Sequence, residues 1–240
     1  MTEPLYVEDA YLNACEAKIV AVNDRGGIVL DRTVFYPTGG GQPGDRGRIA
    51  ATSGLEIAIA TTVKGAAPGE IVHVPAEGEA EKLARLAPGD AVRAEIDWDY
   101  RYALMRMHTA MHVLSAALPY PVTGGQVGAE KSRLDFLLPD PPAKEEATET
   151  LNALIAGDHP VASEWISDEE LAANPDLVKT MSVKPPSGAG RVRLIRVGEI
   201  DLQPCGGTHV KNTSEIGPVS VAKIESKGKQ NRRVAIKFAE

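Results

Sequence analysis

The sequence predicts an α+β protein in which a small N-terminal β-barrel precedes an α+β domain with an antiparallel sheet. Three observations support this prediction: short apolar runs between glycine-rich turns, one long helical segment directly after them, and alternating helix and strand patterns in the rest of the chain. The change in composition near residues 90–97 marks a boundary, which divides the chain into domains of 1–94 and 95–240.

The first domain is predicted to be rich in β-strands because apolar runs alternate with turn residues. Ala17–Val22 and Ile28–Leu30 flank the turn sequence NDRGG, which is the pattern of a β-hairpin. Further short strands are expected within 55–65, 70–78 and 87–97, each bounded by glycine or proline.

The second domain is predicted to begin with a helix at Asp97 to Leu118. This segment has no glycine or proline, Asp97 or Asp99 can cap it, and Pro119 stops it. A second helix is expected at 144–156, and a short helix after an acidic cap at Ser167 or Asp168. Strands are expected at 161–167 and as a pair on either side of the basic turn SKGKQNRR. Two further segments are each expected to hold one strand: in 122–138 a loop leads into the strand, and in 188–204 the strand leads into a loop.

Composition narrows the class of protein. Two cysteines argue against a secreted disulfide scaffold, and the N-terminus lacks the basic and apolar regions of a signal peptide. No apolar run is long enough to span a membrane. We therefore expect a soluble cytoplasmic protein, either a monomer or a weak dimer.

The charge is unevenly distributed. The net charge of −7 is not typical of a general nucleic-acid binder, but the segment from Lys184 to Glu240 holds 11 Lys/Arg against 5 Asp/Glu. This local excess fits either contact with a polyanion or a solvated basic face.

Two pairs of residues have the spacing of metal ligands. His108 and His112 lie one helical turn apart and so share one face of the predicted helix. Cys205 and His209 flank two glycines, and thiolate and imidazole are both zinc ligands. Either pair alone is weak evidence, but together they use three of the five histidines and one of the two cysteines. The sequence is not that of a metalloprotease, because no glutamate follows His108.

Motifs along the chain resemble a known family. HTAMH at 108–112 and CGGTHVKNTSEIGPVSV at 205–221 are similar to the editing domain of alanyl-tRNA synthetases and to the free-standing AlaX editing proteins. DRTVFYPTGGGQPGDRG at 31–47 resembles the glycine-rich segment of the barrel domain that precedes this editing core, and GGQVGAEKSRLDF at 124–136 resembles the loop and strand after the histidine helix. The resemblance extends from about Tyr6 to Phe238 and is closest to the middle-length AlaX form.

The resemblance implies a zinc-dependent deacylase, an ester hydrolase of tRNA(Ala) that carries serine or glycine in place of alanine. It implies Zn²⁺ ligands at His108, His112, Cys205 and His209. Hydrogen bonds to the seryl hydroxyl would separate serine from alanine, and Thr33, Thr38 and Gln126 are the candidate partners. Met111 stands where the family often has threonine.

Contacts with the tRNA are expected from two sources. The resemblance implies that the glycine-rich loop closes over the acceptor end or packs the domains together, and a series of β-turns in the barrel is the alternative. It is not a nucleotide-binding loop, because it has neither the dinucleotide-binding order of glycines nor a Walker lysine. The basic residues would contact phosphates. The candidate residues are Gly39, Gly40, Gly41, Arg101, Arg106, Lys223, Lys227, Lys229, Arg232 and Arg233.

Two other functions compete with this prediction. A non-catalytic tRNA-binding module with a structural zinc would use the same four ligands as a closed site. A metallohydrolase with another substrate is less consistent with the sequence, because no carboxylate lies between His108 and His112.

Overall fold

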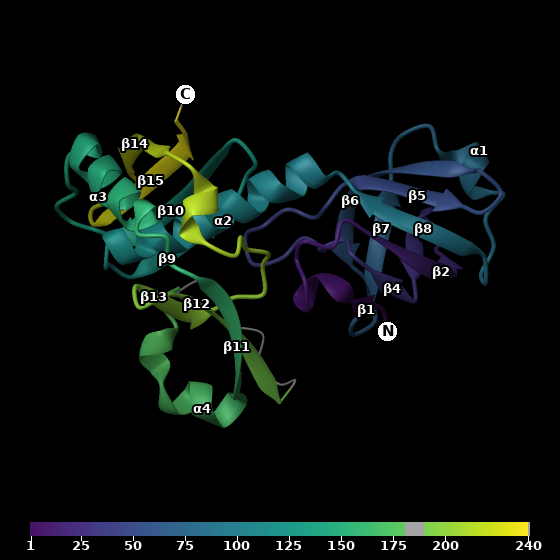
Figure 1. Cartoon of the computed structure of the whole chain (residues 1–240), viewed down its shortest axis with the longest axis horizontal. Coiled ribbons are helices and arrows are strands. Elements are labelled where there is room, and N and C mark those ends of the chain that lie inside the picture. The colour runs from purple at the N-terminus through teal and green to yellow at the C-terminus, as the bar shows by residue number, and fades with distance from the viewer. Residues whose placement is uncertain (181–189, 240) are drawn as a thin grey trace. The chain divides into compact units, whose positions relative to one another are not determined.

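Six strands close an antiparallel barrel in the N-terminal part of the chain, in the order β2-β3-β7-β6-β5-β8. The computed structural model describes residues 1–180 and 190–239, and the chain divides into two compact units, Met1–Tyr102 and Ala103–Glu240 (Figure 1). The barrel strands are β2 (Ala14–Val22), β3 (Ile28–Leu30), β5 (Gly47–Ala51), β6 (Glu56–Lys64), β7 (Ile71–Pro75) and β8 (Ala91–Ile96). The same unit holds β1 (Glu3–Pro4), which pairs parallel with β4 (Arg32–Thr33), and the short helices η1 (Leu5–Val7) and α1 (Ala80–Leu83).

The barrel interior is filled by aliphatic side chains from alternate strand positions. In β6, Ile57 and Ile59 are buried while their neighbours are exposed, as expected for a strand with one face in a core. They pack with Ile19, Leu30 and Ile49 in one hydrophobic cluster.

A buried ion pair lies in the first unit, where the helix α2 (Trp98–Ala117) begins. The Arg101 side chain is completely buried and forms a salt bridge with Asp45, whose side chain is 1% exposed. The guanidinium also donates to the backbone carbonyls of Ala10 at 2.9 Å and Val34 at 2.7 Å. These contacts connect the start of α2 to two barrel loops.

The remainder of α2, from Ala103 onward, forms the centre of the second unit. Leu104 and Val113 point to opposite sides of the helix, and both are fully buried. Apolar residues on opposite sides of the segment require cover on both sides, and the histidines are buried together with them.

A four-stranded antiparallel sheet in the order β14-β15-β10-β9 belongs to this unit. Its strands are β9 (Val122–Gln126), β10 (Lys131–Leu137), β14 (Val219–Ser226) and β15 (Asn231–Phe238). The helix α3 (Lys144–Ala156) lies beside β14 (Figure 1), where Asn152 bonds both backbone groups of Val219 and Thr148 accepts from the Val221 amide.

A second sheet has three antiparallel strands, β11 (Val161–Ser167), β12 (Arg191–Val197) and β13 (Asp201–Pro204). The short helix α4 (Asp168–Ala173) follows β11 and begins with a capping box between Ser167 and Glu170. Two 3-10 helices complete the unit, η2 (Pro175–Leu177) and η3 (Thr213–Ile216).

The barrel, the antiparallel sheets and the mixed helix and strand content agree with the predicted fold class. Five strands, β1, β4, β5, β9 and β13, were not expected. β9 reads VTGGQ, and its two glycines hide the strand pattern. A Cβ atom on Gly125 would lie 2.9 Å from Leu134 Cδ2, so the glycine allows β9 to approach β10 closely. β13 is only four residues long and ends in proline.

Within the described part of the chain, the helices are all too short or too polar to cross a membrane.

Candidate metal centre

The helix α2 presents two histidines to one site. His108 and His112 are 6% and 5% exposed, and their ring centroids lie 5.5 Å apart. The i, i+4 spacing places both imidazoles on one helix face, and the surrounding apolar positions of α2 bury them.

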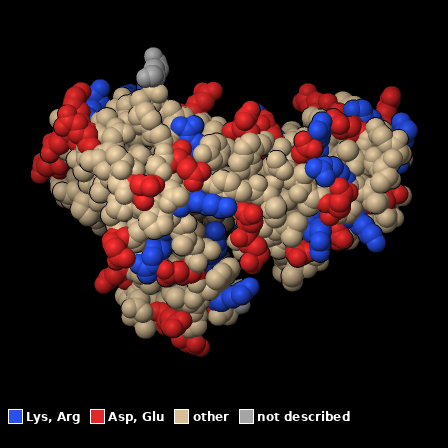
Figure 2. Space-filling view, in the orientation of Figure 1, with Lys and Arg blue, Asp and Glu red and all other residues tan. Residues whose placement is uncertain are grey.

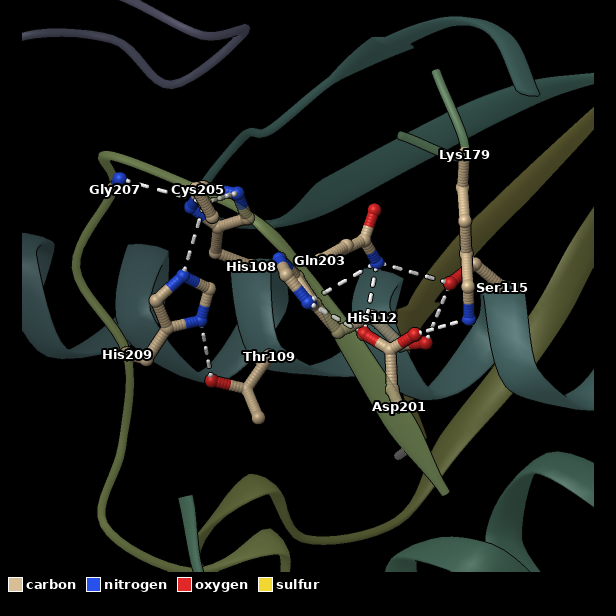
Figure 3. A network of polar contacts seen from close by, with 10 residues as sticks. All are labelled: His108, Thr109, His112, Ser115, Lys179, Asp201, Gln203, Cys205, Gly207 and His209. Carbon is tan, nitrogen blue, oxygen red and sulfur yellow. Dashed lines mark hydrogen bonds and ion pairs between the residues drawn. The ribbon is translucent and has the colours of Figure 1, made fainter. Parts of the chain in front are cut away.

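The loop after β13 brings a cysteine and a third histidine against this helix face. Cys205 Sγ lies 3.5 Å from His108 Nε2 and 3.3 Å from His209 Nε2. One ligand atom from each of the four residues lies within 4.8 Å of all the others (Figure 3). The structure thus brings together the four residues that the sequence predicts as ligands.

The backbone of the CGGTH segment brings Cys205 and His209 together without a left-handed glycine. Neither Gly206 nor Gly207 adopts a positive φ. The Gly207 amide donates to Cys205 Sγ at 3.4 Å, and Arg193 donates to the Gly207 carbonyl at 2.8 Å. The loop is therefore held by hydrogen bonds to its backbone.

Thr109 fixes the orientation of His209. Its hydroxyl donates to the Met105 carbonyl at 3.0 Å, so the hydroxyl oxygen is available to accept from His209 Nδ1, which lies 3.1 Å away. A proton on Nδ1 leaves Nε2 with its lone pair directed toward Cys205. Thr109 thus selects the tautomer that can bind a metal ion.

Asp201 fixes the orientation of the His112 ring in the same way. Its Oδ2 lies 2.8 Å from His112 Nδ1, and its side chain is fully buried. Lys179 Nζ pairs with the other carboxylate oxygen at 2.5 Å, and Gln203 Nε2 donates to Oδ2 at 2.8 Å (Figure 3). The ring is therefore held with Nε2 toward the cluster.

The donor atoms fit a zinc ion. Three imidazole nitrogens and one thiolate are a known tetrahedral zinc set, and the oriented Nδ1 atoms of His112 and His209 form the outer contacts that such sites have. Carboxylate-rich sites suit magnesium or calcium instead. The cluster is thus a candidate metal site.

Without a metal ion, the pKa values of the clustered side chains are shifted in different directions. Burial raises the pKa of the Cys205 thiol, but the adjacent His108 and His209 outweigh it and hold this pKa well below its usual value. Burial lowers the pKa of His112, but hydrogen bonds to Asp201 and Cys205 outweigh it and raise the pKa to about 9. Burial, together with His108, lowers the pKa of His209 to about 3. The cysteine is thus ready to act as a thiolate ligand.

Four residues that orient the histidines of this site were not predicted from the sequence: Thr109, Asp201, Gln203 and Lys179. Asp201 and Gln203 precede Cys205 by four and two residues, and strand alternation places all three on one face of the sheet. That alternation was a usable signal. Lys179 comes from a segment with no motif, so only the fold identifies it.

Two of the predicted substrate contacts lie in the barrel unit. Thr33 is completely buried, with its hydroxyl 2.8 Å from His73 Nε2, and it accepts from the Phe35 amide. These hydrogen bonds lie inside the barrel unit. The prediction that Thr33 contacts the substrate is therefore corrected. Thr38 is exposed, and its hydroxyl bonds the Thr62 carbonyl and the Gly44 amide.

Gln126 lies in the same unit as the metal cluster. It is exposed at the end of β9, opposite Arg133 in β10. At the preceding residue, a Cβ on Gly125 would lie 3.3 Å from Met111 Cε, so β9 passes close to α2 between its two histidines. The position is compatible with the predicted substrate contact.

The structure corrects the prediction for Arg101. It was expected to contact tRNA, but its side chain is fully buried and bonded to Asp45 and to two carbonyls. A lone arginine on a predicted helix gives no sign of which side is buried, so the sequence could not distinguish the two cases. Arg106 also makes contacts within the protein: it donates to the Ile216 carbonyl, and its guanidinium carbon lies 4.1 Å from the centroid of the Phe238 ring.

The basic residues of the β14–β15 hairpin differ from one another. Arg233 is paired with Asp135 at 2.8 Å, and Arg232 donates to the Pro139 carbonyl. Lys227 and Lys229 are exposed in the turn. Figure 2 shows both acidic and basic side chains on the visible face.

The glycine-rich loop has the backbone that its sequence suggests. Gly40 and Gly41 adopt φ values of 58° and 84°, which favour glycine, and both are exposed. Gly39 is half-buried, forms a β-bridge with Gln42 and accepts a hydrogen bond from the Tyr36 hydroxyl at 2.8 Å.

Comparison with known domains defines the class of this protein. Residues 10–100 match the tRNA synthetases class II (A) family, and residues 192–235 match the threonyl and alanyl tRNA synthetase second additional domain. The second match includes Cys205 and His209. Two segments of the chain, one in each unit, thus match domain families of tRNA synthetases.

Whole-chain relatives define the family. The chain is 39% identical over 243 residues to the alanyl-tRNA editing protein AlaX-M of Methanosarcina acetivorans, covering 98% of both chains. It is 36% identical to the AlaX-M of Saccharolobus solfataricus, again over 98% of both. Alanine–tRNA ligase of Pyrobaculum aerophilum matches 93% of this chain but only 25% of its own length, at 36% identity. The chain belongs to the AlaX-type alanyl-tRNA editing proteins.

Proposed function

We propose that this protein hydrolyses the ester bond of serine wrongly attached to tRNA(Ala), with glycine as a second substrate, at a zinc site formed by His108, His112, Cys205 and His209. The observation that carries the proposal is the convergence of the four candidate ligand atoms within 4.8 Å, in a unit whose residues 192–235 match a synthetase additional domain. The names of the relatives, alanyl-tRNA editing proteins, support tRNA(Ala) as the partner.

Substrate would approach the cluster from the side of Cys205. The three histidines are buried, whereas Cys205 is half-buried and lies on a loop. A bound zinc ion would supply Lewis acidity or a fixed point for the amine and ester of the substrate. Thr109 and Asp201 keep the imidazoles in place, so the ligand geometry is set before substrate arrives.

Serine would be separated from alanine by hydrogen bonding to its hydroxyl. A pocket that binds this hydroxyl rejects alanine because the pocket's buried polar groups would stay unpaired. Gln126 and Thr38 are the exposed candidates for this contact. Gln126 is favoured because β9 passes beside α2 at Met111.

A direct test compares deacylation of Ser-, Gly- and Ala-tRNA(Ala) by the same preparation, with zinc content measured in parallel. We expect rapid release of serine, slower release of glycine and little release of alanine. Removal of zinc by a chelator should abolish the activity, and added zinc should restore it. Equal rates on serine and alanine would rule out editing, and full activity without metal would rule out the role of zinc.

The alternative is a tRNA-binding module with a structural zinc. Four protein ligands complete a tetrahedral set, which favours a closed structural site. This alternative predicts binding of tRNA(Ala) with no release of serine, so the same assay separates the two functions.

A further inference from the structure

The β11–β12–β13 sheet has one face that continues outward from the metal cluster. Strand alternation places Val192 and Leu194 of β12 on the face covered by Leu171 of α4, in one hydrophobic cluster. Asp201 and Cys205 belong to the opposite face, where Asp201 meets His112. We call this opposite face the cluster face.

A row of three residues crosses the cluster face from the metal ligand to the edge of the sheet. The Cys205 amide donates to the Arg193 carbonyl at 3.1 Å, and Arg193 pairs directly with Trp165 in β11. β11 is the edge strand of this sheet. With strands about 4.8 Å apart, Trp165 lies about 10 Å from Cys205 along the sheet.

Trp165 is among the most exposed large apolar side chains of the described residues, at 42%. One side of its ring is covered by Arg191, whose guanidinium carbon lies 4.4 Å from the ring centroid. Arg191 and Arg193 both belong to the cluster face, since they are two positions apart in β12 and Arg193 pairs with Trp165. An aromatic ring backed by a cation, beside a second cation, is the arrangement that binds single-stranded nucleic acid.

We propose that Trp165, backed by Arg191, stacks a nucleobase in the single-stranded 3′ end of the aminoacylated tRNA. The inference rests on the proposed function, because the ester at the metal cluster fixes where the 3′-terminal nucleotide lies. The nucleotides next to it would then leave the cluster on the side of Cys205, the least buried of the four residues. Trp165 lies in that direction on the same sheet face, and Arg191 supplies positive charge for the adjoining phosphates.

Substrate length provides the first test. Trp165→Ala is assayed on a seryl-minihelix that ends in single-stranded CCA and on seryl-adenosine, which has no neighbouring nucleotide. We expect kcat/KM to fall about tenfold or more on the minihelix, mainly through KM, and to stay unchanged on seryl-adenosine. Trp165→Phe should keep most of the activity, and Arg191→Ala should show a smaller loss with the same dependence on length.

Tyr120→Ala is the matched control, since Tyr120 is 41% exposed in the same unit. It should leave both substrates unaffected. An unchanged kcat/KM on the minihelix in Trp165→Ala would overturn the proposal, and so would an equal loss on both substrates, which would indicate a structural effect. Zinc content, measured for each variant, shows whether the cluster is intact.

A binding test works even if no ester is cleaved. In a Trp98→Phe background, Trp165 is the only tryptophan, so its fluorescence reports on its own contacts. Deacylated minihelix with a CCA end should quench it, whereas the same duplex with a blunt end should not. Quenching without deacylation would reject the proposed function and keep the stacking site. Deacylation without quenching would keep the proposed function and reject the stacking site.

Discussion

The carboxylate of Asp201 is held by three side chains. It accepts from His112, Lys179 and Gln203 while completely buried. Burial raises the pKa of this carboxyl, but His112 and Lys179 outweigh it and hold the pKa below its usual value. The carboxylate therefore remains an acceptor for the Nδ1 proton of His112, which is the contact that directs Nε2 toward the cluster.

Replacing Asp201 should weaken metal binding. We expect Asp201→Ala to lower zinc affinity about 10- to 100-fold, because His112 would lose the contact that orients it. Competition with a chromophoric chelator measures the affinity. Glu164→Gln is the control, since Glu164 is ion-paired in the same sheet but belongs to the face away from the cluster. An affinity equal to that of the control would show that Asp201 does not position His112.

We expect His73 to make the stability of the barrel depend on pH. Burial lowers the pKa of this fully enclosed imidazole from 6.5 to about 4. The unfolded chain binds a proton at His73 near pH 6.5 while the folded chain does not, so its contribution is complete above pH 6.5 and is lost as the pH falls toward 4. The shift corresponds to about 3 kcal/mol.

Urea unfolding at several pH values tests this expectation, with Trp98 fluorescence as the probe of the first unit in a Trp165→Phe background. Other groups titrate in the same range, so the difference between variants is the informative quantity. His73→Gln should lose part of the decline in unfolding free energy between pH 6.5 and 4. His159→Gln, at a half-buried position in the second unit, should keep it. Equal slopes in the two variants would reject the assignment to His73.

At the scale of the element, α2 combines two tasks along its length. Its first turn carries Arg101, whose bonds to Asp45, Ala10 and Val34 lie within the barrel unit. Its middle carries His108 and His112 of the candidate metal centre. A single continuous helix thus serves both units, although each unit has its own core.

Removal of the Arg101 side chain should destabilise the barrel. We expect Arg101→Met to lower the unfolding free energy by about 3–5 kcal/mol, because Asp45 would remain buried without its partner. Arg46→Met, which breaks an exposed pair with Asp97, should cost about 1 kcal/mol or less. Urea unfolding followed by Trp98 fluorescence measures both. A cost no larger than that of Arg46→Met would refute the structural role of the buried pair.

Local patterns predicted several elements well. The helix at Lys144–Ala156 was expected with the same bounds, and Trp98–Ala117 falls within the predicted segment. Both segments have helix-forming composition, one is stopped by Pro119 and the other follows a proline-marked linker, and these signals act locally. β9 was hidden by Gly124 and Gly125, because a glycine in a strand is explained only by what packs against it. The hairpin of β12 and β13 was read as one strand and a loop for a similar reason, since β13 is short and polar.

At the scale of the whole molecule, two units of different composition carry two family matches. Residues 10–100 match the class II synthetase family and residues 192–235 the additional domain. The predicted domain boundary at 94/95 follows the change in composition, whereas contacts divide the chain after Tyr102. The difference arises because α2 begins with residues that pack on the barrel, which composition does not reveal.

The sequence by itself identified the two candidate ligand pairs. One helical turn separates His108 from His112, and one short loop joins Cys205 to His209, so spacing alone limits each pair to a small region. Only the tertiary structure decided that the pairs meet, that Asp201 and Lys179 lie behind His112, and that Arg101 is buried. It also placed Trp165 in a row with Cys205. The physical reason is that helix and turn geometry act over a few residues, whereas strand register and packing join segments with no common local pattern.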